Sequence, residues 1–88
     1  MIDTDTTTAA PEWTRAPVQP PEESATGSYR GFYLTANSYG WNVLGRWNGY
    51  SVMASEHNYL PNRPSFDDNM TAAIAAADDL ATKGWEPR

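Results

Sequence analysis

Residues 29–55 alternate between apolar or aromatic and polar positions, and turn-forming residues interrupt the pattern twice. Three segments have the aromatic and β-branched content that favours strands: YRGFYLTA at 29–36, WNVLGRW at 41–47 and YSVMAS at 50–55. NSYG at 37–40 predicts the first turn. Asn48–Gly49 predicts a two-residue hairpin turn, because a type I′ turn needs a positive φ at both central positions. The pattern therefore predicts three antiparallel strands.

The short turn at 48–49 fixes the register of the last two strands and so decides which residues share a face. The more apolar face is the expected floor of the core, and it carries Trp41, Val43, Gly45, Trp47, Tyr50, Val52 and Ala54. The other face is expected to point outward, and it carries Asn42, Leu44, Arg46, Ser51, Met53 and Ser55. Gly45, opposite Val52, leaves room for the close approach of a helix or a bulky side chain.

A helix is predicted after residue 65, because apolar residues recur there at helical spacing: Phe66, Met70, Ala73, Ile74, Ala77, Leu80 and Ala81. Ser65 and Asp68 match a capping box, which marks the helix start. Gly84 is expected to end the helix, and Trp85 to fold back on the helix end or on the sheet. The predicted fold is therefore α+β, with a three-stranded antiparallel sheet packed on one C-terminal helix.

The N-terminal segment 1–27 differs in composition from the rest of the chain. It is rich in Thr, Pro, Ala, Glu and Ser and poor in aliphatic residues, which is typical of disorder. We therefore expect an acidic, Thr/Pro-rich disordered tail at 1–27 and one small domain at 28–88. Trp13 stands out in the tail: it either anchors a partner, folds back onto the domain, or has no role.

Charge and cysteine content narrow the classes of function. The net charge is -5, and the segment 1–27 supplies -4 of it, from five acids against one base. Residues 28–88 carry six acids and five bases, so the domain lacks the basic footprint of most nucleic-acid-binding proteins. The absence of cysteine excludes disulfides and thiolate zinc sites. With neither a signal peptide nor an apolar run long enough to span a membrane, we expect a short cytoplasmic reading frame without membrane contact.

Catalytic groups are sparse. His57 is the single histidine of the chain, and a serine nucleophile would need it as a base together with an orienting acid. The acidic pairs that begin at Asp67 and at Asp78 lie eleven helical residues apart, about 16 Å, which is too far for one metal ion. No glycine-rich phosphate loop is present. We expect no enzymatic activity, no metal and no cofactor.

The aromatic residues are the best candidates for binding. One helix covers one sheet face, so some rings of the strands are expected on the outer face or at the rim, where they would mark a partner surface or a homodimer face. The alternative is that a small domain needs these rings for its core. The loop at 56–65 is longer than usual, and long loops are often functional. The predicted partner-binding residues are Arg30, Phe32, Tyr39, Leu44, Arg46, Tyr59 and Arg63.

Three strands followed by a helix, opening with YRGF and closing with AAIAAADDLATKG, resemble the plant ethylene-response-factor DNA-binding domain and the arm-binding domains of phage integrases. The resemblance covers about residues 29–84. It implies a sheet that enters the DNA major groove, with Arg30, Trp41, Arg46 and Trp47 at the positions available for contacts. The dense run of arginines found in that family is absent, and the acidic chain disfavours nucleic acid.

A short chain with an acidic Thr/Pro/Ala tail and a Trp-rich domain is also similar in style to small accessory proteins of actinobacterial phages. This resemblance implies binding to one host protein and modulation of it, in the host cytoplasm. We therefore expect a non-enzymatic module that docks on a host protein through an aromatic sheet face. A nucleic-acid-binding domain of the integrase arm-binding type, using the same face, is the alternative, and a homodimer through that face is a third possibility.

Overall fold

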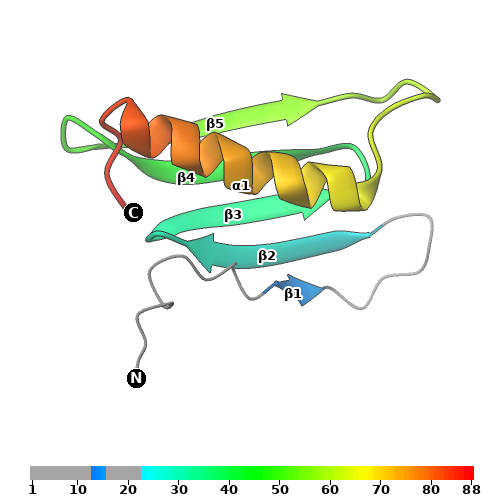
Figure 1. The fold of residues 1–88 in the computed structure, drawn as a ribbon, viewed down its shortest axis with the longest axis horizontal. Coiled ribbons are helices and arrows are strands. Elements are labelled where there is room, and N and C mark those ends of the chain that lie inside the picture. Colours follow the sequence, from blue (N-terminus) through cyan, green and yellow to red (C-terminus); the bar gives the residue numbers. More distant parts are fainter. Residues whose placement is uncertain (1–12, 16–22) are drawn as a thin grey trace.

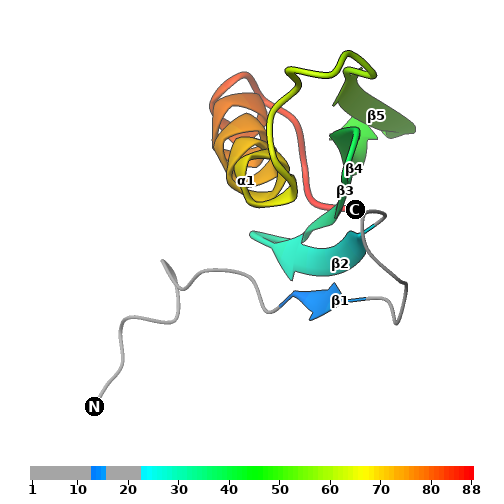
Figure 2. The same cartoon turned by 90° about the vertical axis from the view of Figure 1, so that its right-hand side faces the viewer.

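The computed structural model describes residues 13–15 and 23–88. The described chain forms one antiparallel sheet of five strands in the order β1-β2-β3-β4-β5, with one helix on one of its faces (Figures 1 and 2). The elements are β1 (Thr14–Arg15), β2 (Ser24–Tyr29), β3 (Phe32–Asn37), β4 (Gly40–Trp47), β5 (Tyr50–His57) and α1 (Phe66–Thr82). The prediction of a small α+β domain with a C-terminal helix is confirmed, whereas the predicted strand number is wrong, since the sheet has five strands and not three.

A turn at Arg30–Gly31 explains part of the difference between the three predicted strands and the five observed strands. The two residues have φ values of 54° and 84°, so the chain reverses in a tight turn where one continuous strand, 29–36, was predicted. Tyr29 pairs with Phe32 across this turn. A left-handed backbone is uncommon for arginine, and for this reason the sequence did not indicate a turn at Arg30.

Two strands lie within the segment that was expected to be a disordered tail. Ser24–Gly27 of β2 pairs with Leu34–Asn37 of β3, and β1 pairs with β2. Ala25 is buried against Ala36, Phe66 and Met70, so this weak strand sequence is held by its neighbours. Trp13 packs partly buried against both core clusters, which agrees with the fold-back alternative. Residues 1–12 and 16–22 lie outside the described residues, and the prediction for them stays a prediction.

The core lies between α1 and the middle of the sheet. Its two clusters of buried residues are Phe32, Leu34, Val43, Ala73 and Ala77, and Ala25, Ala36, Phe66 and Met70. The predicted capping box at Ser65 and Asp68 is present, and Gly84 has a φ of 104° just after the helix. Figure 2 shows α1 facing β3 and β4 while β5 twists away from it.

The register predicted for the last hairpin is confirmed in full, from Trp47 opposite Tyr50 to Asn42 opposite Ser55. The bulky group expected near Gly45 is the Phe32 ring, which lies 2.7 Å from the place where a Cβ of residue 45 would stand. The C-terminal segment closes the same region: Trp85 packs on the core, and Glu86 exchanges two backbone hydrogen bonds with Arg46, of 2.9 and 2.8 Å.

Replacement of Gly45 by alanine is expected to lower the free energy of unfolding by about 1–3 kcal/mol, because the added methyl overpacks the core. It would meet both the Phe32 ring and, at 2.9 Å, the carbonyl oxygen of Glu86. Urea denaturation measures the effect, with Ser51→Ala on the exposed part of β5 as the control. Equal stability of Gly45→Ala and the wild type would contradict this packing.

Candidate binding site

The structure separates the seven predicted binding residues into four places. Tyr39, Tyr59 and Arg63 meet at the end of the sheet where the loop 58–65 begins. Leu44 and Arg46 lie on the outer face as predicted from the hairpin register. The prediction that Phe32 lies at the surface is wrong. Phe32 is 1% exposed and belongs to the core, because the turn at 30–31 places it on the helix side of β3.

The outer sheet face is polar and not aromatic. Tyr33, which is 37% exposed, is the single Phe, Tyr or Trp that the described strands place on this face. A row of small polar residues crosses it through paired positions of all five strands: Thr14, Thr26, Thr35, Asn42 and Ser55. The other strand rings point to the helix side or to the rim, so the expectation of an aromatic outer face is not met.

Arg30 has a structural role that the sequence did not indicate. Its guanidinium lies 2.8 Å from Asp78 Oδ1 on α1, and the Tyr29 hydroxyl donates a 2.9 Å hydrogen bond to the same oxygen. The Arg30 hydrogen bond, reinforced by that of Tyr29, holds the pKa of the Asp78 carboxyl below its usual range. The bond to Asp78 in turn raises the pKa of Tyr29. This contact joins the β2–β3 turn to the helix.

At the opposite end of the sheet, four side chains form a cluster that we call the loop stack: Tyr39, His57, Tyr59 and Arg63. The Tyr59 ring stacks on Tyr39 with centroids 5.0 Å apart and on His57 at 6.4 Å. The Arg63 guanidinium lies 4.6 Å from the centroid of the Tyr39 ring and donates through Nε to the Ser38 carbonyl at 2.9 Å. The backbone bond from Asn58 N to Tyr39 O, 2.7 Å, holds the base of the stack.

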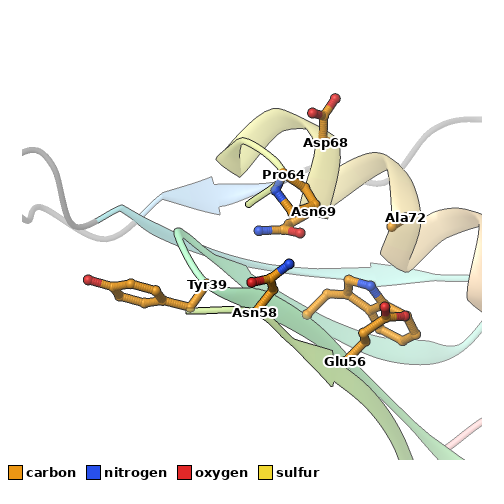
Figure 3. A pocket seen from close by; sticks show the side chains of 8 residues that line it. Tyr39, Glu56, Asn58, Pro64, Asp68, Asn69 and Ala72 are labelled. Carbon is orange, nitrogen blue, oxygen red and sulfur yellow. The ribbon is translucent and has the colours of Figure 1, made fainter. Parts of the chain in front are cut away.

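A cleft of about 350 Å³ lies beside the loop stack, between the first turns of α1 and the ends of β4 and β5 (Figure 3). Its lining residues are Tyr39, Trp41, Glu56, Asn58, Pro64, Asp68, Asn69 and Ala72. Of the predicted binding residues, the cleft includes Tyr39. Sequence reasoning missed Glu56, Asn58 and Asn69, because only the docking of α1 on the sheet brings these residues together.

Exposed large apolar side chains gather along β5 and the loop that follows it. Tyr50 is 75% exposed and Tyr59 70%, and Met53 and Leu60 are also exposed. β5 is an edge strand of eight residues, and no described strand pairs with its free edge. Most of the exposed apolar surface therefore follows β5 and the loop after it.

Comparison of the chain with protein-family models, curated proteins and solved structures finds no match. Within residues 13–15 and 23–88, no helix is long and apolar enough to cross a membrane. The same residues contain no group of three or more histidine, aspartate or glutamate side chains placed to hold a metal ion.

We expect the replacement of Asp78 by asparagine to lower the urea midpoint of unfolding more at neutral pH than at about pH 2.5. The lowered pKa of Asp78 adds stability above the pKa of the unfolded carboxyl, 3.8, and this stability is lost as the pH falls through the folded value. Urea titrations of both proteins at the two pH values measure the difference. A difference in midpoint that is independent of pH would contradict the ionic role of Asp78.

Proposed function

We propose that this protein is a small non-enzymatic binding module that receives an extended segment of a protein partner along the edge of β5. The observation that carries the proposal is the eight-residue edge strand β5, whose free edge no described strand pairs with and which has exposed apolar side chains beside it. In line with the resemblance to phage accessory proteins, the proposed partner is a host protein in the cytoplasm. Binding of this module modulates the activity of that host protein.

The backbone of β5 supports strand addition. Tyr50 flanks the two-residue turn, and the backbone N–H of Asn58 donates to the carbonyl oxygen of Tyr39. Along β5 the backbone groups of successive residues point alternately to the two sides, so the even-numbered residues from 50 to 58 direct theirs to β4. The N–H and C=O groups of Ser51, Met53, Ser55 and His57 therefore point away from the sheet. Edge strands that avoid pairing commonly carry proline, lysine or a bulge. The sequence YSVMASEH contains neither proline nor lysine, and its pairing with β4 is continuous.

The side chains along the edge provide contacts on both sides of an added strand. Tyr50 lies on the helix side of β5, and Met53 lies on the outer side beside Leu44. The loop stack stands at the far end of the strand. In β-strand addition, main-chain hydrogen bonds supply affinity and alternate side chains supply specificity. Of the predicted residues, Tyr59 and its stacking partner Tyr39 lie near the end of this edge.

The nucleic-acid alternative has less support. Of the four positions suggested by the resemblance to integrase arm-binding domains, Arg46 lies on the outer face. Trp41 and Trp47 point to the helix side of β4, and Arg30 is paired with Asp78. A homodimer through the outer face would rest on Tyr33, Leu44 and Met53, a narrow row within a polar surface.

A proline at Met53 tests the proposal. The Met53 N–H points outward, so Met53→Pro removes an edge donor while the bonds to β4 remain; Met53→Ala changes the side chain alone. The partner is first captured from an actinobacterial lysate, with and without nuclease, and its affinity is then measured for each variant. We expect Met53→Pro to weaken binding by about 2 kcal/mol or more, roughly 30-fold, and Met53→Ala to weaken it less.

Thermal unfolding of both variants controls for folding. Equal affinity of folded Met53→Pro and the wild type would overturn strand addition. Loss of the captured material after nuclease treatment would favour the nucleic-acid alternative, and concentration-dependent sedimentation of the protein by itself would favour the homodimer.

A further inference from the structure

The cleft between α1 and the end of β5 is rich in hydrogen-bond acceptors, and none of the described residues that line it is cationic. Glu56 and Asp68 contribute carboxylates, and Asn58 and Asn69 contribute amides. Tyr39 and Trp41 add aromatic surface. Its volume of about 350 Å³ falls in the range of small-ligand pockets, roughly 300–1,000 Å³. A ligand that fits this lining carries positive charge, several hydrogen-bond donors and a flat apolar part.

Asn69 gives an independent indication of a ligand. It is 5% exposed, and its Nδ2 donates a 2.9 Å hydrogen bond to the carbonyl oxygen of Asn37. A carbonyl only accepts, so this bond fixes the orientation of the amide. No described residue donates to the remaining Oδ1. Figure 3 shows the Asn69 amide projecting from α1 toward the side chain of Asn58 in the cleft. A buried acceptor without a donor is unfavourable, and a donor from a ligand would remove that cost.

The two carboxylates of the cleft, Asp68 and Glu56, have different contacts in the structure. Asp68 accepts from the Ser65 backbone N–H in the capping box, at 3.2 Å, and with Asp67 offsets the positive end of the helix dipole. Glu56 lies on the helix side of β5, opposite Trp41, and has no ion-pair partner among the described residues. Glu56 is therefore the carboxylate left to meet a cation.

The aromatic lining suits a planar cation. Arg63, which is not part of the cleft lining, places its guanidinium 4.6 Å from the centroid of the Tyr39 ring. Because the Tyr39 ring already contacts Arg63 and stacks on Tyr59, Trp41 is the aromatic ring of the lining that is left for a ligand. A guanidinium combines donors in a fixed fork, for Glu56 and Asn69, with a flat surface for an aromatic ring.

We infer that the cleft binds a basic side chain, above all an arginine, of the segment that pairs with β5. The inference rests on the proposed function, because side chains on the helix side of an added strand would lie beside Glu56. It adds the chemistry of the partner: an extended segment with an arginine or a lysine at one position.

The test uses the whole protein with N-acetyl-arginine amide as the probe, and N-acetyl-citrulline amide as its neutral counterpart. Two-dimensional NMR follows the Asn58 and Asn69 side-chain amides and the Trp41 indole N–H. We expect the arginine probe to shift these signals and the citrulline probe to leave them unchanged. Glu56→Gln is expected to weaken the arginine probe about tenfold, which corresponds to about 1.4 kcal/mol.

Two further variants separate the cleft from general surface charge. Glu86→Gln makes the same charge change at the opposite end of the molecule, next to Arg46, and is expected to bind the probe like the wild type. Ala72→Leu fills the cleft without a change of charge and is expected to abolish binding. Equal responses to both probes, or an arginine response that Glu56→Gln and Ala72→Leu leave intact, would overturn the inference.

The two proposals fail separately. Met53→Pro leaves the cleft unchanged, so the arginine probe is expected to bind it normally. If the probe does not bind while Met53→Pro still weakens partner binding, the basic side chain is wrong and strand addition stands. If the probe binds while Met53→Pro leaves partner affinity unchanged, the cleft stands and strand addition is wrong.

Discussion

One helix of 17 residues covers one face of a five-stranded sheet, and this limits which side chains of the strands can be buried. α1 packs over β3 and β4, so the large apolar residues of the strands gather on its side of the sheet: Phe32, Leu34 and Val43 are the largest side chains that are fully buried. The opposite face consequently consists mostly of threonine, serine and asparagine. β5 lies to the side of the area that α1 covers (Figure 2). Its outer edge pairs with no described strand, and the cleft lies between it and the first turns of the helix.

The two ends of the sheet have different roles. At one end, Asp78 joins the Arg30 turn to the helix, and the C-terminal segment pairs with Arg46 and packs Pro87 against Gly31. At the other end, the loop 58–65 borders the cleft through Asn58 and Pro64 and exposes the ring of Tyr59 to solvent. The contacts of the first end join the turns, the helix and the C-terminal segment, whereas the second end combines exposed rings, charge and a strand edge that no described strand pairs with.

Local chemistry explains which features of the fold are predictable from the sequence. Asn48–Gly49 fixes the β4–β5 register, and Ser65 with Asp68 fixes the helix start, because each depends on residues close in the chain. The Arg30–Gly31 turn and β2 were not predicted, since an arginine at a positive φ and the strand SATGSY are stabilised by distant partners. Because this turn was not predicted, Phe32 was expected at the surface and not in the core. The face on which a strand residue lies depends on where the strand begins.

The candidate site follows the same rule. Tyr39, Tyr59 and Arg63 were predicted from their residue types and from the length of the loop, and the structure brings them into one cluster. Glu56, Asn58 and Asn69 come from three different parts of the fold, and no local pattern connects them. Their role depends on the position of α1 against the sheet edge, which only the tertiary structure defines.

Hydrogen exchange of the backbone amides of β5, with and without the captured partner, shows whether a strand is added to β5. In the protein by itself, the amides of Ser51, Met53 and Ser55 are expected to exchange quickly, and those of Val52 and Ala54 slowly, because only the latter bond to β4. Partner binding is predicted to slow the exchange of Ser51, Met53 and Ser55. If these three amides exchange equally fast in the complex and in the protein by itself, no strand has been added to β5 and the partner binds elsewhere.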